Sequence, residues 1–577
     1  MQLAEIVTRL RDTGAELEDV EVKLGKGGLP DSLTATLCAF ANSRGGLVII
    51  GLDEAAGFAA TGVPRAPAMR DALVGLAREK ITPSLLPSVE VAAFEGVNLV
   101  IAEVPPLPED QRPCYVTSRG LYNGAYTRIG DGDHRLTSYE VDRMRENAGQ
   151  PRWDDTPVGQ ATVDDLERAS ALRLIEIARA RTPRAFSGID EMQALTRLGV
   201  VKQEGDRLVP SLAGLLSVGT YPQQFFPQLA LTVAVYPHAK PGQPGPGGER
   251  FLDSAALGGP IPELVEGALR VVQRNLRTVS RIIGAGRHEQ WDLEPEVVRE
   301  AIVNALMHRD YSPQSRGTQV QIELYPDRLT VTSPGGLFGN VHLETLGRVG
   351  TSSSRNSRLA ALLQDAADPL TGRPVAENRG SGVSMMIDQV RRSTGAVPVF
   401  AAGLAEFRVT IPRTSPLTPQ VRDWIAKLRP GAGLADAQRM AIAMAASGYD
   451  IDVAVLTRLG LDPSGARRQL RELAGLGLLR PRSTREEGPY RLAVAPPEAG
   501  SALEGFLSAP VAPSVPRLGA EILRVLAPGD EMSREEIQIA TGAGRSSVVN
   551  ALAELLDSGA ISATAPARSP NRRYRIR

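Results

Sequence analysis

Cysteine is nearly absent from this sequence, which has only Cys38 and Cys114 among its 577 residues. Two cysteines are too few for a disulfide framework or a cysteine-based zinc cluster, and they are typical of a reducing compartment. No stretch approaches the ~20 apolar residues that a membrane-spanning helix needs, and the start, MQLAEIVTRLRD, has no apolar signal core. We therefore expect a soluble, cytoplasmic protein without a membrane segment.

The sequence also has almost no net charge, since its formal charge at pH 7 is -1. The overall charge thus predicts no polyanionic partner, and any nucleic-acid surface must arise from local segregation of charge. Short-period repeats are absent as well. At roughly 150 residues per domain, a chain of this length is expected to fold into several domains.

Stretches rich in proline and glycine divide the chain into blocks. The most prominent are PHAKPGQPGPGG (237–248), RTSPLTP (413–419) and PVAPSVP (510–516). They predict domains at 1–150, 151–247, 248–413, 417–495 and 515–577, of which the second is a helical connector. The last two blocks resemble each other, because each has helices followed by a basic, strand-like tail.

The segment VVREAIVNALMHRDYS (297–312) predicts a helix with an unusual polar face. Glu300, Asn304 and His308 follow one another at intervals of four residues, so they share one side of the helix. The opposite side is apolar, as expected of a helix packed on a core. Because asparagine is a poor helix former, the polar line favours a binding role over plain exposure to solvent.

Two glycine turns follow this helix. The segment 318–337, TQVQIELYPDRLTVTSPGGL, predicts two strands joined by a Pro-Asp turn and ending in a glycine turn. A second turn, RGSG (379–382), opens another helix and would offer backbone N–H groups and a positive helix end to a phosphate. AEFRVTIP (405–412) closes the block as a strand.

In this order the segments resemble the GHKL (gyrase, Hsp90, histidine-kinase, mismatch-repair) ATP-binding fold, from about Pro260 to Arg413. The similarity is greatest to the RecG-like transcriptional-regulator branch, which carries R-E-A-x-x-N-A-x-x-H-R-D-Y. The resemblance implies a Bergerat-type α/β sandwich that binds ATP and Mg²⁺, with Asn304 as the metal ligand. It also implies that Glu300 is the general base of a slow hydrolysis.

The same resemblance supplies further nucleotide contacts. Those expected are His308, Ser333, Gly335, Gly336, Arg355, Arg379, Gly380, Gly382 and Thr410. Ser333 and Pro334 replace the aspartate that usually accepts a hydrogen bond from adenine, so a serine hydroxyl, helped by Thr410, would have to accept it instead. This departure puts adenine specificity in question, and a scaffold without nucleotide binding is the alternative.

Three motifs near the N-terminus occur in a characteristic order. VEVK (20–23), AFANSRGGLVIIG (39–51) and GAYTRIG (124–130) together resemble the Schlafen/AlbA-type α/β domain over roughly residues 14 to 145. That family is associated with nucleic-acid binding. The resemblance implies contacts to DNA, or alternatively RNA, by Lys23, Arg44 and Arg128.

Some members of that family cleave RNA with a metal-bound acidic cluster. Glu16, Glu21 and Asp53 occupy comparable positions, and converging carboxylates suit Mg²⁺ or Mn²⁺. The alternative is structural: Glu21 pairs with Lys23 or an arginine, and the other two are solvated acids.

The last two blocks have the layout of winged helix-turn-helix domains. In the final block Ser533 and Glu536 predict a capping box. Its predicted nucleic-acid contacts are Arg545, Ser546 and Asn550 on the second helix and Arg572 and Arg573 in the wing. The preceding block offers Arg467, Arg468 and Arg471 on its helix and Arg480, Arg482 and Arg485 in its wing. Winged helices also serve as protein–protein modules, which is the alternative for both.

The expected protein is thus a multidomain α+β, ATP-binding and DNA-binding regulator of transcription. Nucleotide binding in the GHKL-type domain would control nucleic-acid binding and the assembly of a homo-oligomer such as a dimer. The alternatives are a nucleotide-gated, Schlafen-like metal-dependent nuclease in phage defence and a structural assembly protein.

Overall fold

The computed structural model describes residues 3–240, 242–283, 286–348, 350, 353–377, 380–428 and 433–495, and short pieces at 526, 532–533, 536–538, 552, 561–564 and 573–576. The chain forms two compact units, one of Met1–Pro241 with Phe251–Pro497 and one of Gly242–Arg250 with Glu498–Arg577. Within the described residues, no helix has the length and apolar character needed to cross a membrane.

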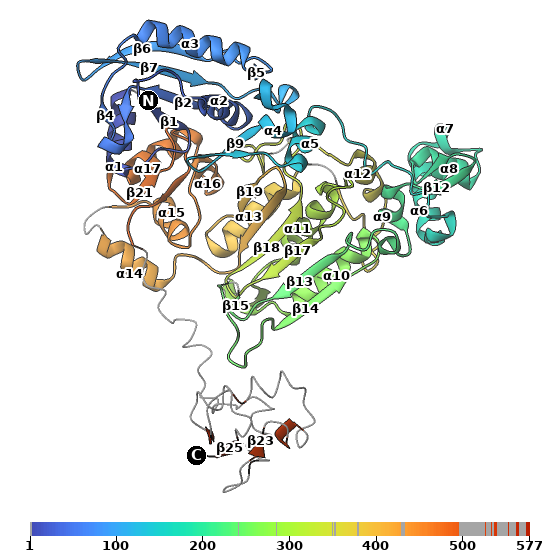
Figure 1. Ribbon diagram of the computed structural model, residues 1–577. Coiled ribbons are helices and arrows are strands. Elements are labelled where there is room, and N and C mark those ends of the chain that lie inside the picture. The colour runs from blue at the N-terminus through green and yellow to red at the C-terminus, as the bar shows by residue number, and fades with distance from the viewer. Residues whose placement is uncertain are drawn as a thin grey trace. The chain divides into compact units, whose positions relative to one another are not determined.

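The N-terminal part of the first unit is a four-stranded sheet of order β1-β2-β7-β6, shown in blue in Figure 1. Its strands are β1 (Val20–Lys23), β2 (Gly46–Ile50), β6 (Ser88–Phe94) and β7 (Val97–Val104). The helices α1 (Leu3–Thr13), α2 (Leu33–Asn42) and α3 (Ala66–Glu79) supply side chains to its two apolar clusters. Every residue of α2 is buried, which makes this helix the centre of the block.

Short elements complete this part of the chain. They are β3 (Leu52–Asp53), β4 (Ala59–Ala60), β5 (Ile81–Thr82), β8 (Tyr115–Val116), α4 (Leu121–Gly124), β9 (Tyr126–Ile129), β10 (Gly132–Arg135) and α5 (Ser138–Asn147). Thr137 and Glu140 form a capping box at the start of α5. This helix leads from the N-terminal sheet to the central block, and its side chains Tyr139 and Arg143 contact Asp310 of that block.

The central block is built on a six-stranded mixed sheet of order β14-β13-β17-β18-β20-β19. The strands are β13 (Leu231–Val235), β14 (Asp253–Leu257), β17 (Val320–Leu324), β18 (Arg328–Pro334), β19 (Val399–Ala402) and β20 (Glu406–Pro412). β13 and β17 are parallel, and the other neighbours are antiparallel. Alternating side chains along β17 are buried, whereas β18, next to it in the sheet, is buried along most of its length.

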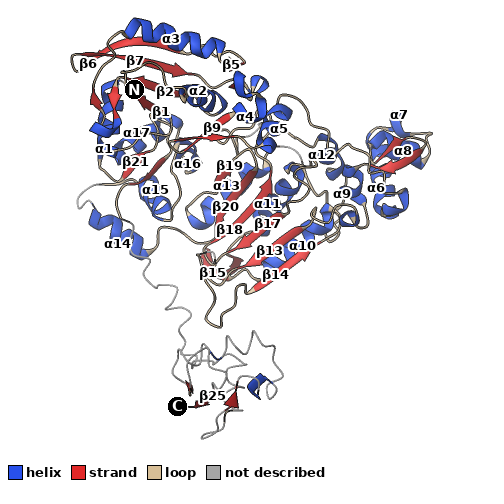
Figure 2. Cartoon of the chain, in the orientation of Figure 1, coloured by secondary structure: helices blue, strands red, loops and turns tan. Residues whose placement is uncertain are grey.

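Three helices pack on this sheet: α10 (Ile261–Arg274), α11 (Pro295–His308) and α13 (Gly382–Thr394), as Figure 2 shows. α11 buries eight apolar residues, which confirms the apolar side predicted from its 3.6-residue period. The other elements are α6 (Arg168–Arg181), α7 (Pro183–Phe186), α8 (Glu191–Leu198), β11 (Val201–Glu204), β12 (Arg207–Pro210), α9 (Leu212–Val218), the hairpin β15 (Thr278–Ile283) and β16 (Gly286–Trp291), and α12 (Ser357–Leu363).

The predicted boundary between residues 247 and 248 is wrong. β13 lies inside the predicted connector 151–247, yet in the central sheet it lies between β14 and β17 and pairs with both. The run 237–248 therefore joins two adjacent antiparallel strands, with Val235 opposite Asp253. Proline and glycine are equally typical of a strand connection and of a domain linker, so composition alone could not separate them.

The last block of the first unit has helices followed by a hairpin, the layout expected for 417–495. Its elements are α14 (Pro419–Leu428), α15 (Asp436–Ala446), α16 (Val453–Arg458), α17 (Pro463–Gly475), β21 (Leu479–Pro481) and β22 (Tyr490–Leu492). Ile451 adds a bridge to Tyr490 beside the hairpin. Its apolar core includes Ile387 of α13, so this block packs on the central one.

The second unit contains a three-stranded sheet of order β23-β25-β24. Its strands are β23 (Met532–Ser533), β24 (Ile561–Ala563) and β25 (Arg573–Ile576). The N–H of Ser533 donates to the Glu536 carboxylate at 2.7 Å, and the N–H of Glu536 donates to the Ser533 Oγ at 3.3 Å, as expected of the predicted capping box. Arg545, Ser546, Asn550 and Arg572 lie outside the described residues.

Candidate nucleotide site and nucleic-acid surfaces

A cavity of about 840 Å³ lies where α11, β18 and the start of α13 meet. Its walls bring together most of the residues predicted to contact a nucleotide. These are Glu300, Asn304, His308, Ser333, Gly335, Gly336, Gly380 and Gly382. The segment Leu337–Arg348, which follows the first glycine turn, supplies further wall residues. The polar face of the helix therefore looks into a cavity of a size suited to a small ligand.

The polar face of α11 is internally bonded. The Nδ2 of Asn304 donates to the Oε1 of Glu300 at 2.8 Å, so the asparagine amide oxygen is the end available to a ligand. Burial raises the pKa of Glu300 above its ordinary value, while the bond from Asn304 and the charge of Arg299 oppose that rise. A carboxylate with a raised pKa next to an amide oxygen is a suitable pair for a base and a metal ligand.

The start of α13 packs directly on that carboxylate. A Cβ on Gly382 would lie 1.7 Å from the Glu300 Oε1, so a residue with a side chain at 382 would collide with it. Gly380 has a φ of 68°, a left-handed conformation that glycine adopts without strain. The two glycines of the RGSG turn thus allow the helix N-terminus to approach α11 closely, whereas Arg379 lies outside the described residues.

His308 and Arg355 interact electrostatically, but only His308 lines the cavity. Burial, with a contribution from the Arg355 charge, lowers the pKa of His308 to about 4, so the imidazole is neutral near pH 7. Arg355 is 2% exposed and does not line the cavity. Its Nη2 donates to the Gly336 carbonyl at 3.2 Å, and its guanidinium lies 5.7 Å from the Phe338 ring centroid. Arg355 therefore supports the glycine turn from behind instead of contacting a phosphate as predicted.

The wall expected to receive the base is largely apolar. Phe400, Phe407 and Val409 line it together with the buried Ser333, whose Oγ donates to the Ala305 carbonyl at 2.8 Å. Thr410 was predicted to assist Ser333, and that prediction is wrong. Side chains alternate along a strand, so the residue after Val409 points to the opposite face of the sheet. The same alternation in AEFRVTIP could have revealed the phenylalanine and valine wall.

The acidic cluster of the N-terminal block is organised around a buried arginine. Arg128 has a side chain only 5% exposed and pairs with Glu21 at 2.8 Å, Asp133 at 3.0 Å and Glu16 at 3.5 Å. Lys23 also donates to Glu21. Arg128 is therefore a structural cation, which corrects its prediction as a nucleic-acid contact, because its guanidinium is buried among carboxylates.

This arrangement also bears on the predicted nuclease centre. Among the residues that the structure describes, no group of three or more aspartate, glutamate, histidine or cysteine side chains is placed to hold a metal ion. Glu16 and Glu21 converge on a cation of the chain itself, and Asp53 lies in β3, paired with Ala59. The geometry matches the structural alternative for Glu21.

Glu16 is expected to make stability depend on pH. Burial raises its pKa to about 7, although the N–H of Val22 donates to its carboxylate. Between its ordinary value of 4.5 and about 7, the folded state keeps a proton that the unfolded chain has released. The free energy of unfolding should therefore fall as pH rises through this window, and Glu16→Gln should flatten the slope in denaturant titrations. Equal slopes in both proteins would assign the effect to other groups.

The arginines of α17 lie on an accessible surface. Arg467, Arg468 and Arg471 have side chains 36%, 70% and 60% exposed. Their ion pairs with glutamates are 3.1, 3.9 and 3.9 Å long, and surface pairs of this kind cost little to break. Arg44, at 56% exposed, is equally accessible, and Arg573 pairs with Glu536 at 2.7 Å. That these residues contact nucleic acid stays a prediction.

Comparison with known proteins agrees with this organisation. Residues 16–137 match the family described as "Schlafen, AlbA_2", and residues 317–411 match the one described as "Putative ATP-dependent DNA helicase recG C-terminal". The chain joins a Schlafen/AlbA_2 domain to a RecG-like C-terminal domain. The resemblances predicted from the sequence for these two parts are confirmed. Together the two domains indicate a DNA-binding, ATP-related protein with a nucleic-acid partner.

Two solved structures are also similar to the chain. The DIP2311 protein from Corynebacterium diphtheriae shares 19% identity over 100% of this chain and 99% of its own, with a TM-score of 0.33. The N-terminal domain of a "Putative ATP-dependent DNA Helicase RecG-related Protein" from Nitrosomonas europaea shares 26% identity over 24% of this chain and 95% of its own, with a TM-score of 0.20. Neither superposition is close enough to carry a structural argument. No curated protein matches the sequence.

Proposed function

We propose that this protein is a DNA-binding regulator of transcription in which Mg-ATP, bound in the 840 Å³ cavity of the RecG-like domain, controls nucleic-acid binding. One observation carries the proposal: Glu300, Asn304 and His308, spaced along one helix face, line a single cavity against the glycine-opened start of α13. Solvated polar residues on a surface helix would not share a cavity with a second helix terminus.

Different cavity residues would contact the metal, the phosphates, the attacking water and the base. The amide oxygen of Asn304 is a hard ligand that would hold Mg²⁺, and the bound metal would supply positive charge against the phosphates. The N-terminus of α13 would offer backbone N–H groups to the phosphates. Glu300, with its raised pKa, would take a proton from the attacking water. Phe400, Phe407 and Val409 would hold the base by apolar contact.

Nucleic-acid binding would come from the winged-helix blocks and the Schlafen/AlbA_2 domain. The exposed arginines of α17, together with Arg44 and Arg573, would contact phosphates. Nucleotide can control this binding only if ATP has different affinities for two arrangements of the chain. The nuclease alternative has less support, because Arg128 and Lys23 neutralise the carboxylates that a metal would need.

Calorimetric titration with Mg-ATP and Mg-GTP tests the proposal. We expect binding of one nucleotide per chain that is lost when Mg²⁺ is chelated. Because the Ser333 hydrogen is already donated to a carbonyl, its oxygen gains one modest bond from adenine, so ATP should be preferred by only about tenfold or less. The absence of binding heat with either nucleotide would contradict the proposal.

A further inference from the structure

The loop between β21 and β22, residues 482–489, is packed against the Schlafen/AlbA_2 domain. We call this loop the wing. The N–H of Glu18 donates to the Arg482 carbonyl at 3.0 Å, and the Arg482 guanidinium pairs with the Glu18 carboxylate at 2.6 Å. Thr484 donates its N–H and its Oγ–H to the two oxygens of the Asp19 carboxylate, at 2.8 and 2.7 Å. The adjacent carboxylates of Glu18 and Asp19 thus bind three atoms of the wing: a guanidinium nitrogen of Arg482 and the backbone nitrogen and Oγ of Thr484.

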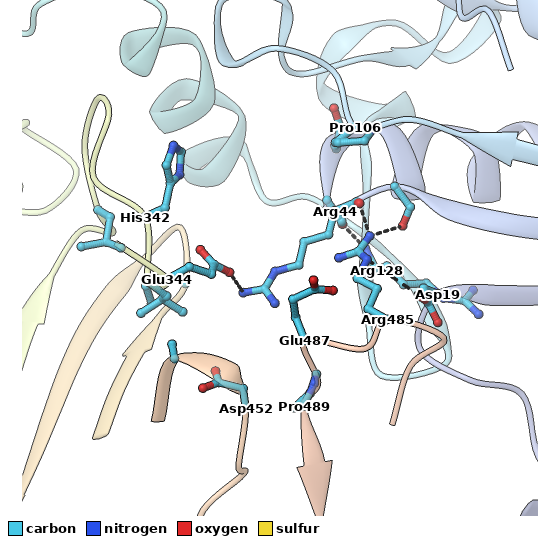
Figure 3. A pocket seen from close by; sticks show the side chains of 18 of the residues that line it. Asp19, Arg44, Pro106, Arg128, His342, Glu344, Asp452, Arg485, Glu487 and Pro489 are labelled. Atoms are coloured by element: carbon cyan, nitrogen blue, oxygen red, sulfur yellow. Dashed lines mark hydrogen bonds and ion pairs between the residues drawn. The ribbon is translucent and has the colours of Figure 1, made fainter. Parts of the chain in front are cut away.

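The second wing arginine is engaged by the same domain. Arg485 donates to the carbonyls of Arg44 and Gly45, the latter at 3.3 Å, and its Nε lies 4.0 Å from the Asp19 carboxylate. Figure 3 shows Arg485 and Asp19 side by side, with the Arg44 side chain reaching toward Glu344. The side chains of Arg482 and Arg485 are only 27% and 30% exposed. Both guanidinium groups are partly exposed and already engaged by carboxylates or carbonyls of the chain, Arg482 also by Asp450 of its own block at 3.2 Å.

Carboxylates and phosphates are interchangeable partners for arginine, since both accept paired N–H bonds from the guanidinium. Glu18 pairs with one wing guanidinium at 2.6 Å, and the Asp19 carboxylate lies 4.0 Å from the other. The contact also sets the wing against Arg44, a predicted nucleic-acid residue of the Schlafen/AlbA_2 domain. The same groups cannot bind both the chain and a nucleic acid.

We propose that the docked wing is an autoinhibitory latch that holds the protein in a state of low affinity for DNA. The inference rests on the proposed function, and it specifies how that function is regulated. With the latch closed, Glu18 and Asp19 compete with DNA for Arg482 and Arg485. Opening frees the wing, so the apparent affinity for DNA depends on the fraction of molecules in which the latch is open.

The nucleotide cavity reaches the latch through the segment 337–348. Leu337, Val341 and Arg348 line both the 840 Å³ cavity and a second cavity of about 1510 Å³ that the wing borders. In the same segment Glu344 pairs with Arg44 at 3.4 Å, and the Leu343 carbonyl accepts from Arg458 of α16 at 2.6 Å. A nucleotide that moves this segment changes contacts on both sides of the latch.

Thr484→Val tests the latch without changing charge. It removes the Oγ–H donor to Asp19 and keeps the shape of the side chain. The matched control is Thr457→Val on α16, whose Oγ–H donates within its own helix to Val453 at 2.8 Å and which lines the same larger cavity. Anisotropy of a labelled duplex should show about tenfold tighter binding by Thr484→Val, because a hydrogen bond to a charged group is lost from the closed state. Thr457→Val should bind like wild type.

The outcomes separate the two proposals. If the wild-type protein binds DNA and Thr484→Val leaves that affinity unchanged or weakens it, the latch proposal alone is overturned. Failure of every variant to bind DNA contradicts the proposed function and the latch with it. Hydrogen exchange gives a second measurement on the unmodified chain, because the amides of Glu18 and Thr484 both donate across the contact. Saturating DNA should speed their exchange, and unchanged protection in the DNA complex would overturn the latch.

Discussion

Asn304→Ala is expected to weaken Mg-ATP binding by about 100-fold or more, beyond detection in a calorimetric titration. The substitution removes the amide oxygen offered to the metal. It also removes the donor of the 2.8 Å hydrogen bond to Glu300. The Glu300 carboxylate, whose pKa is already raised by burial, then loses the bond that opposes this rise. The charge repulsion between that carboxylate and the nucleotide phosphates would then be opposed by neither Mg²⁺ nor the amide.

The matched control is Asn340→Ala. Asn340 lies in the segment 337–348 and lines the larger cavity but not the 840 Å³ cavity. We expect the control to bind Mg-ATP like wild type and to have the same thermal stability. Unchanged affinity in Asn304→Ala would show that this cavity is not a metal–nucleotide site.

Arg143→Ala is expected to lower the free energy of unfolding by roughly 3–5 kcal/mol, the usual cost of leaving a buried charge without its partner. Arg143 of α5 is 2% exposed and pairs at 3.0 Å with Asp310, which is fully buried just after α11. Asp310 also accepts from Tyr139 and Ser315, at 2.8 and 2.9 Å. The pair joins the N-terminal block to the helix that carries the nucleotide site, so its loss should loosen both.

Denaturant titration of Arg143→Ala beside Arg145→Ala measures this effect. Arg145 lies two residues further along α5 and is exposed, so its removal should change stability by less than about 0.5 kcal/mol. Equal losses in the two variants would mean that the buried pair with Asp310 adds nothing beyond ordinary helix surface charge. A loss confined to Arg143→Ala supports its role as the junction between blocks.

The nucleotide site could be predicted from the sequence because its residues depend on local geometry. The four-residue spacing of Glu300, Asn304 and His308 fixes them to one helix face, and glycine turns mark positions where backbones approach closely. These relations hold whatever the rest of the chain does. The structure accordingly places the three polar residues of this helix face and the described glycines of both turns around one cavity.

The misplaced residues depend on tertiary context that local patterns do not contain. A buried arginine such as Arg128 looks the same in sequence as one on a surface, and only its three carboxylate neighbours distinguish it. The phosphate contact predicted for Arg355 was wrong for the same reason, since the position of this residue behind the glycine turn follows from packing. Thr410 was a different error, because strand alternation was legible in the sequence and contradicted the prediction.

The most direct test of the account is the affinity of the wild-type protein for a labelled DNA duplex, measured at one salt concentration with and without saturating Mg-ATP. If nucleotide in the cavity controls nucleic-acid binding, the two dissociation constants should differ by at least about fivefold, the lower end of usual allosteric coupling. Superimposable binding curves, in a protein shown by calorimetry to be saturated with ATP, would contradict it.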